Sequence, residues 1–166
     1  MKRIVILLLA LAPYFVLSQG QVTNEINWIS LEKAKEYAKK YDKNIFVYFY
    51  KKDCPYCEEM KKETLSDQTV IDLINNNFFP VNIDSRTKDT IYYNNKVYGN
   101  QQPASSGRHD WRHDFYHEIA RFTQQGKELT TTPTVVLFNS KFEKITVFPG
   151  KQAKPLLLRR IKPYIK

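Results

Sequence analysis

Two cysteines separated by two residues carry the clearest chemical signal in this chain. Cys54 and Cys57 are its only cysteines, and they follow an apolar run at 45–50 and precede a helical pattern at 58–65. A cysteine pair at the junction of a buried strand and a helix can cycle between dithiol and disulfide, because the N-terminus of the helix stabilises the attacking thiolate. We therefore interpret the pair as a redox centre rather than as a cross-link.

The three histidines form a second candidate site. His109, His113 and His117 recur every fourth residue, and two histidines four apart on a helix can chelate a transition metal. A helix is predicted over about 109–122, and its apolar stripe consists of Trp111, Phe115, Ile119 and Phe122. Each histidine lies two residues from the stripe, so we expect the set to face solvent. Metal binding and partner recognition stay open as alternatives to a solvated face.

The elements that must position the cysteines alternate between helices and strands. Periodicity predicts helices over 30–41, 54–65, 66–75 and 109–122, and a closing helix whose first residue is Pro155. Strands are predicted at 45–50, 78–83, 91–93, 96–98, 134–138 and 144–148. The strands at 45–50 and 78–83 are apolar without alternation, which is typical of central strands buried on both faces. The order of elements indicates an α/β domain.

Length and the first residues set the organisation of the chain. With 166 residues the chain has room for one domain with a proper core, so the cysteines are not needed to hold it together. Residues 1–18 are typical of a secretory signal peptide, because Lys2 and Arg3 precede an almost wholly apolar run at 4–17. We therefore expect a signal peptide at 1–18, an N-terminal extension at 19–27 and one domain at 28–166.

The charge pattern argues against a nucleic-acid partner. Removing Lys2 and Arg3 from the 26 basic residues leaves 24 against 17 acidic residues, a formal charge of +7. Most of the excess lies on predicted helical faces, where it is solvated. The aromatic residues do not interleave with the basic clusters in one groove-like stretch, as a nucleic-acid module requires. We expect no nucleic-acid partner and a monomer.

Three separated features together resemble the thioredoxin-like superfamily, in particular the thiol:disulfide interchange proteins exported to the bacterial envelope. They are the order of elements, the helix start at Cys54-x-x-Cys57, and Thr132-Pro133 ahead of a buried strand. The resemblance covers about 28–165. It implies a thioredoxin fold, with a central mixed β-sheet flanked by helices and a hairpin-plus-helix insertion at about 85–131 before a cis-proline.

The resemblance also implies roles for the residues of the site. Cys54, at the exposed N-terminus of its helix, would be the nucleophile that attacks a substrate disulfide, and Cys57 would resolve the mixed disulfide. The redox-active disulfide would then be Cys54-Cys57. In this family Pro133 is a cis-proline that positions the substrate, and Thr132 presents backbone groups to an extended substrate peptide. The intervening Pro55-Tyr56 would complete the substrate-binding surface.

Two positions depart from the thioredoxin pattern. Thioredoxins carry a buried acid six residues before the nucleophile, where this chain has Tyr48. The lysine partner of that acid lies four residues before the position of Asp84, which follows the second buried strand, and there this chain has Pro80. The usual proton relay is therefore absent, and we expect resolution of the mixed disulfide to depend on water or on a substituted group.

These observations predict an exported thiol:disulfide oxidoreductase, periplasmic or extracellular, that exchanges electrons with cysteines of envelope proteins. A reductive role is favoured over an oxidase or isomerase, because such relatives commonly receive electrons from a membrane partner. The two sulfurs carry the chemistry, so no cofactor is expected. The alternative is a thioredoxin-fold metal carrier using Cys54, Cys57 and Met60, or a redox-inert binding module, although Met60 fits better in the core. The insertion at 85–131 is expected to shape substrate choice, or else to extend the sheet edge passively.

Overall fold

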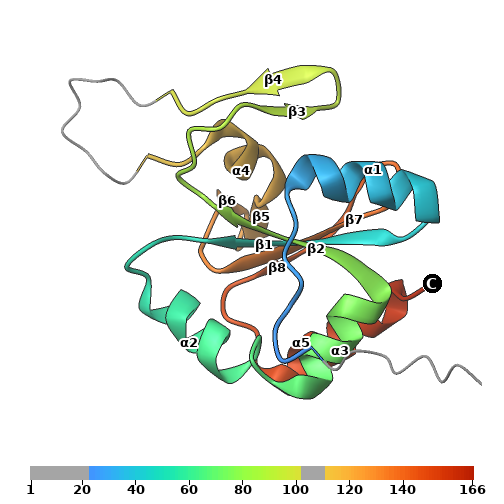
Figure 1. Ribbon diagram of the computed structural model, residues 1–166. Helices are drawn as coiled ribbons and strands as arrows, with labels where there is room; N and C mark the ends of the chain where they lie inside the picture. Colours follow the sequence, from blue (N-terminus) through green and yellow to red (C-terminus); the bar gives the residue numbers. More distant parts are fainter. Residues whose placement is uncertain (1–22, 102–110) are drawn as a thin grey trace, which may run out of the picture.

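A mixed β-sheet forms the centre of the computed structural model, which describes residues 23–101 and 111–166 (Figure 1). The predicted signal peptide and His109 lie outside the described residues. Within the described part, four strands pair in the order β2-β1-β7-β8. Their bounds are β1 (Asn44–Tyr50), β2 (Phe78–Asp84), β7 (Thr134–Phe138) and β8 (Lys144–Pro149). The pair β1–β2 is parallel, and the pairs β1–β7 and β7–β8 are antiparallel.

The two central strands are buried because both of their faces carry apolar side chains. Every residue of β7 is buried, and β1 is buried from its first residue through Phe49. Val47 lies opposite Val81 on β2 and opposite Val136 on β7, so three branched side chains share one row across the sheet. The buried strands predicted at 45–50 and 78–83 are confirmed.

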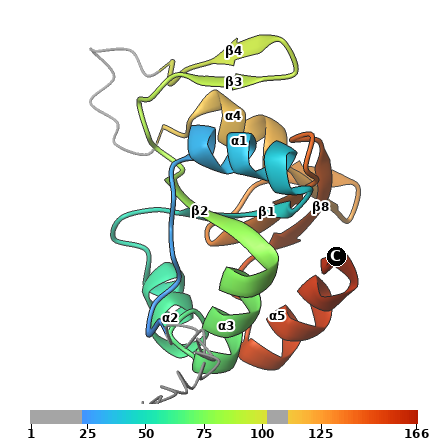
Figure 2. The same ribbon diagram turned by 45° about the vertical axis from the view of Figure 1, so that its right-hand side comes forward.

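Helices cover both faces of the sheet, as the view in Figure 2 shows. The first face carries α1 (Leu31–Tyr41) and α4 (Asp114–Ile119), which pack with Val47 and Phe49 of β1. The second face carries α2 (Pro55–Glu63), α3 (Gln68–Asn77) and α5 (Lys154–Ile161), which pack with Phe46 and Tyr48. The predicted class, a central mixed sheet flanked by helices, is confirmed. No helix in the described ranges is both long and apolar enough to cross a bilayer.

Local sequence signals fix where the helices begin. The Ser30 hydroxyl caps α1 by accepting a first-turn N–H at 3.3 Å, and the Asp67 carboxylate caps α3 in the same way at 3.0 Å. Helix α5 begins at Lys154, so Pro155 is its second residue and not its first as predicted. Proline is tolerated at either position, because the first-turn N–H groups have no partner inside the helix.

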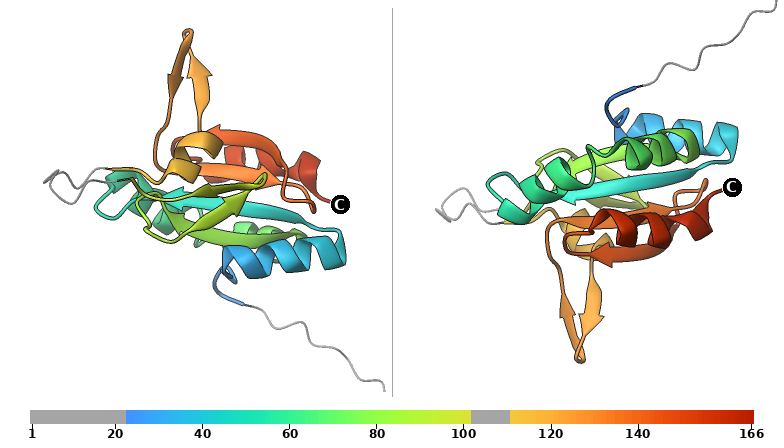
Figure 3. Two further views of the ribbon diagram at one scale, coloured as in Figure 1. Left: turned by 90° about the horizontal axis from the view of Figure 1, so that it is seen from above. Right: turned by 90° about the horizontal axis from the view of Figure 1, so that it is seen from below.

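Between β2 and β7 the described residues form two hairpins. The first consists of β3 (Ile91–Tyr93) and β4 (Lys96–Tyr98), and it confirms the prediction. Asn94 and Asn95 close it with φ of 49° and 60°. The second consists of β5 (Phe122–Gln124) and β6 (Lys127–Leu129), which the sequence analysis does not contain. Figure 3 shows this second hairpin projecting from the body of the domain.

The helix predicted over 109–122 is wrong in extent. Helix α4 spans only Asp114–Ile119, although Phe115 and Ile119 are buried as the apolar stripe predicts. Phe122, the last member of that stripe, is instead the first residue of β5 and is half-buried. The chain reverses at Gln125-Gly126, where both residues adopt positive φ. A tight turn of this type favours a hairpin, and the hairpin removes Phe122 from the helix.

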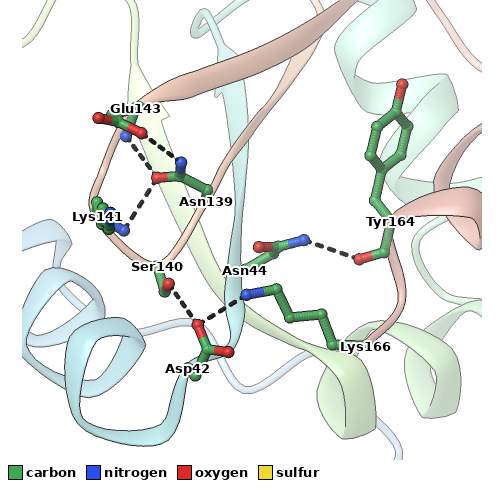
Figure 4. A network of polar contacts seen from close by, with 8 residues as sticks. All are labelled: Asp42, Asn44, Asn139, Ser140, Lys141, Glu143, Tyr164 and Lys166. Carbon is green, nitrogen blue, oxygen red and sulfur yellow. Dashed lines mark hydrogen bonds and ion pairs between the residues drawn. The ribbon is translucent and has the colours of Figure 1, made fainter.

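A polar network ties the C-terminus to the start of β1, the end of the strand remote from the cysteines (Figure 4). The Asp42 carboxylate accepts from the Ser140 hydroxyl at 2.6 Å and from the Lys166 ammonium at 2.7 Å. The Asn44 side-chain amide donates to the Tyr164 carbonyl at 2.9 Å. These contacts join the end of α1, the β7–β8 turn and the last residues, so this network and the cysteines lie at opposite ends of β1.

Candidate active site

The register of β1 and β7 brings Cys54 and Thr132 together. Phe49, near the end of β1, lies opposite Thr134 at the start of β7, so the loop after β1 meets the loop before β7. Cys54 Sγ lies 3.6 Å from the Thr132 carbonyl oxygen and 3.9 Å from the Thr132 hydroxyl oxygen. The Thr132–Pro133 peptide bond is cis, and Pro133 is buried. The predicted site residues from these two loops therefore lie in one place.

Helix α2 begins directly behind Cys54. The N–H groups of Cys57 and Glu58 donate to the Cys54 carbonyl at 3.0 and 3.1 Å, which closes the first turn. Pro55 suits the first helical position, because its φ is already helical and it has no N–H to satisfy. The Cys54 sulfur consequently lies at the positive end of the helix dipole, and Cys57 lies within the first turn.

Both thiols are free and almost enclosed. Cys54 is 6% exposed and Cys57 is 2% exposed. The N-terminus of the helix is exposed as expected, but the Cys54 thiol itself is covered, because the carbonyl and hydroxyl oxygens of Thr132 lie against its sulfur. The residues exposed at this end of α2 are Pro55 and Tyr56, and Tyr56 is 63% exposed. A partner thus meets an aromatic side chain before it reaches the sulfur.

Cys57 is a thiol that loses its proton with difficulty. Burial raises the pKa of Cys57, and the neighbouring Cys54 thiol raises it further, to about 12. The backbone N–H of Lys51 and the hydroxyl of Thr132 favour the thiolate and offset part of this effect. At neutral pH Cys57 therefore keeps its proton, and a reaction through its sulfur requires a group that removes it.

Tyr48 lies behind Cys57, at the position where thioredoxins carry an acid. Its hydroxyl donates to the Cys57 carbonyl at 3.2 Å, and its ring stacks on Trp28 and on Tyr50, each at a centroid distance of 6.1 Å. Burial raises the pKa of Tyr48, and the nearby sulfurs raise it further. Tyr48 is therefore a hydrogen-bond donor and not a base. The second departure, Pro80, is buried within β2 and offers no titratable group.

A cavity of about 570 Å³ opens beside Cys57. It lies between the segment at 24–28, the aromatic side chains at the end of β1, and α2. The side chains that bear on the site are Trp28, Tyr48, Tyr50, Cys57, Glu58 and Lys61. The sequence does not predict this cavity, because the cavity exists only once the segment at 24–28 packs against β1. The one local hint in the sequence is that a carboxylate, Glu58, directly follows Cys57.

Comparison with known proteins decides the family. Residues 31–162 match the family described as "Thioredoxin-like domain". The chain belongs to this family. The thioredoxin-like chain is also 30% identical to mouse anterior gradient protein 3 over 78 residues, which are 46% of this chain and 47% of that protein, so it spans about half of that relative. It is 29% identical to an uncharacterized protein of Archaeoglobus fulgidus over 92 residues, which are 54% of this chain and 72% of that protein.

Solved structures share the architecture of this thioredoxin-like protein at low sequence identity. DsbH oxidoreductase is similar with a TM-score of 0.55 and 18% identity, over 89% of this chain and 91% of that one. A thioredoxin from Thermus thermophilus is similar with a TM-score of 0.52 and 18% identity, over 85% and 87% of the two chains. At this identity the likeness concerns the fold. The predicted membership of the thioredoxin-like superfamily is confirmed.

The two described histidines of the thioredoxin-like protein do not share a face. His113 is 1% exposed and precedes α4, where its Nδ1 accepts from the Phe115 N–H at 3.1 Å and its Nε2 lies 2.9 Å from the Asp89 carbonyl oxygen. His117 is exposed. The expected solvated face is therefore wrong for His113, because the helix begins only after this residue. No group of three His, Cys, Asp or Glu side chains in residues 23–101 and 111–166 is placed to hold a metal ion.

Helix α4 supports the Thr132 loop of the thioredoxin-like domain from behind. Tyr116 is 1% exposed and donates its hydroxyl to the Thr131 carbonyl at 2.6 Å. The same carbonyl accepts the Thr134 hydroxyl at 2.5 Å. The apolar spacing does not predict a role for Tyr116, because Tyr116 lies beside the stripe and not in it. The insertion therefore reaches the residue next to Thr132.

Met60 belongs to the hydrophobic core of the thioredoxin-like domain. It is fully buried and packs in the cluster that α2, α3 and α5 form against the sheet. The interpretation of Met60 as a core residue is confirmed. A ligand role for its thioether would require it to leave that cluster.

Proposed function

We propose that this thioredoxin-like protein is a thiol:disulfide oxidoreductase that works through Cys54 and Cys57. The observation that carries the proposal is the placement of the two thiols in the first turn of α2, with Cys54 Sγ 3.6 Å from the Thr132 carbonyl oxygen. A thiol at a helix N-terminus with a second thiol one turn away can form a mixed disulfide and then resolve it within the same chain.

The proposed reaction has two steps. The Cys54 thiolate attacks one sulfur of a substrate disulfide, so that a Cys54–substrate disulfide forms and the other substrate sulfur leaves as a thiolate. The Cys57 thiolate then attacks the Cys54 sulfur, which forms the Cys54–Cys57 disulfide and releases the second substrate sulfur as a thiolate. Two electrons pass from the protein to the substrate. The reverse sequence oxidises a substrate dithiol.

The proposed contact surface for a substrate polypeptide consists of the start of α2 and the Thr132 loop. Tyr56 offers a 63% exposed ring beside the nucleophile, and such rings contribute strongly to binding when a partner buries them. The Thr132 carbonyl, which faces the Cys54 sulfur, is placed to accept a backbone N–H of an extended substrate segment. Pro55, which is exposed, extends this surface, and the buried Pro133 supports it from below through its cis peptide bond with Thr132.

The proposed location is outside the cytoplasm, and the proposed substrates are cysteine-containing envelope proteins. The composition of residues 1–18 supports export, and disulfides persist in oxidising compartments. We propose reduction as the direction, with a membrane protein as electron donor, on the basis of the resemblance to exported relatives. Trapping the thiols of the cellular protein with a maleimide tests this direction. A mainly reduced pair supports reduction, and a mainly oxidised pair overturns it in favour of an oxidase.

The activity itself is tested by insulin reduction with dithiothreitol as the electron source. Cys54→Ser should abolish turnover, because it removes the nucleophile. Cys57→Ser should also abolish turnover but accumulate an intermolecular disulfide through Cys54, which names the partners when it is trapped in cells. Full activity of Cys54→Ser would overturn the proposal and leave the metal-carrier or binding-module alternatives.

A further inference from the structure

We propose that Glu58 accepts the proton of Cys57 when Cys57 resolves the mixed disulfide. This inference rests on the proposed function, because it assigns one step of that reaction to a residue of this chain. It answers the question left by Tyr48 and Pro80, which replace the acid and lysine of the thioredoxin pattern.

None of the groups in direct contact with Cys57 is suited to remove its proton. The Tyr48 hydroxyl already donates to the Cys57 carbonyl, and burial raises the pKa of Tyr48 so that it stays protonated. The Lys51 backbone group that favours the thiolate is an N–H donor, and the Thr132 hydroxyl acts as a donor as well. The Cys54 sulfur is bonded to the substrate at this stage. Tyr116 is a second phenol near the sulfurs. Burial raises its pKa, and the charges of Cys57 and Cys54 raise it further, so it also stays protonated.

The cavity beside Cys57 supplies the missing acceptor. Its lining contains two carboxylates, Glu25 and Glu58, and one ammonium, Lys61. Glu58 follows Cys57 in the first turn of α2, and its charge acts on the Tyr48 hydroxyl, which donates to the Cys57 backbone carbonyl. Glu25 belongs to the segment that Asn75 holds against α3 through the Glu25 carbonyl. Glu58 is therefore the carboxylate that lines this cavity from the same helix turn as Cys57.

The size of the cavity and the polar groups in its lining allow the transfer. A space of about 570 Å³ that Glu58, Lys61 and Asn82 help to line admits water, which can carry a proton between groups that do not touch. In the proposed step the Cys57 proton passes to the Glu58 carboxylate and the Cys57 sulfur forms a bond to the Cys54 sulfur. The bond from Cys54 to the substrate breaks, and the substrate sulfur leaves as a thiolate. Glu58 then returns the proton to solvent or to that thiolate, so charge and electrons balance.

The sign of the effect separates proton acceptance from a purely electrostatic role. A carboxylate near a thiol disfavours the thiolate, so as a charge alone Glu58 would hinder Cys57, and its removal would speed resolution. As a proton acceptor Glu58 helps Cys57, and its removal slows resolution. In a merely structural role, Glu58 would stabilise the helix as an acid in its first turn. Its removal would then change the free energy of unfolding, and the ratio of the wild-type to the variant rate of resolution would be the same at pH 7 and pH 10.

The test uses the aromatic disulfide 5,5′-dithiobis(2-nitrobenzoate), whose two released thiolates are followed by absorbance in a stopped-flow instrument. The first release reports attack by Cys54, and the second reports resolution by Cys57. Glu58→Gln should leave the first phase within about twofold and slow the second by at least about 100-fold at pH 7, the lower end of what a positioned proton acceptor contributes. The deficit should shrink towards pH 10, as hydroxide takes over deprotonation of the thiol.

Glu59→Gln is the matched control. Glu59 is the next residue of the same helix turn, pairs with Lys151 at 2.7 Å and is not part of the cavity lining, so both phases should stay within about twofold. A second phase that is unchanged or faster in Glu58→Gln, or slowed equally at pH 7 and pH 10, would overturn the inference. A wild-type protein that gives no second phase would refute the proposed function first, and the role of Glu58 with it.

Discussion

Replacing His113 should destabilise the fold through two identifiable contacts. His113→Ala removes the Nδ1 that caps α4 through the Phe115 N–H, which costs about 1 kcal/mol. It also leaves the Asp89 carbonyl without the Nε2 partner, which costs about 1 kcal/mol more. We therefore expect the free energy of unfolding to fall by about 2 kcal/mol, or somewhat more because the ring is 1% exposed and leaves a space behind.

Urea denaturation followed by tryptophan fluorescence measures this loss, and two variants interpret it. His113→Asn restores a capping side chain but not the Asp89 contact, so it should lose about half as much. His117→Ala, on the exposed part of the same helix, should change the free energy of unfolding by less than about 0.5 kcal/mol. If His113→Ala and His117→Ala shift the urea midpoint equally, the assigned role of His113 is refuted.

The same residue makes stability depend on pH. Burial lowers the pKa of His113 below its ordinary value near 6.5, while Asp89 and Asp114 oppose part of that shift. The unfolded chain therefore binds a proton at a higher pH than the folded chain. The stability that the neutral ring contributes is complete above about pH 6.5 and is lost as the pH falls through the lower pKa of the folded state. His113→Asn should flatten this decline, and an unchanged decline would contradict the burial argument.

Three further outcomes follow from the site. Tyr48→Phe removes the donor to the Cys57 carbonyl, so urea denaturation should show a loss of about 1 kcal/mol while insulin reduction persists; loss of turnover at unchanged stability would contradict a structural role. Tyr116→Phe removes the hydroxyl that donates to the Thr131 carbonyl, so the free energy of unfolding should fall by about 1 kcal/mol. The same change should also slow the reduction of insulin, because Thr131 adjoins Thr132. In Cys54→Ser, iodoacetamide should alkylate Cys57 at a rate that keeps rising above pH 9, because burial, the largest cause that raises the pKa of Cys57, persists without the Cys54 thiol; a plateau below pH 9 would contradict this.

The sequence predicts the fold best where the pattern of apolar residues is long and unambiguous. The uninterrupted apolar run of β1 and the alternation of lysines with apolar residues in α1 leave few alternatives, and both elements have nearly the predicted bounds. The helix at 109–122 fails because Phe122 continues the apolar spacing by coincidence. The Gln125-Gly126 turn, which decides in favour of a hairpin, lies just beyond the stripe and gives only a local signal.

The site is predictable to the extent that neighbours in the chain determine it. Cys54, Cys57 and the absence of an acid at Tyr48 can be interpreted from the sequence, because spacing along one strand and one helix fixes them. The enclosure of Cys54 depends on Thr132, which is 78 residues away in the chain, and the cavity depends on the segment at 24–28. His113 is a similar case, since a capping ring can be recognised only when the first residue of the helix is known.

The polar network at the C-terminus gives the molecule a natural point of attachment. Because Asn44 at the start of β1 is bonded to Tyr164 and Cys54 follows the end of that strand, a label or surface tether on Lys166 sits at the far end of the sheet from the thiols. A protein immobilised this way presents its dithiol to the solution. The Lys166 ammonium lies 2.7 Å from Asp42, so the attachment should use the backbone at Lys166 and leave this ammonium unmodified.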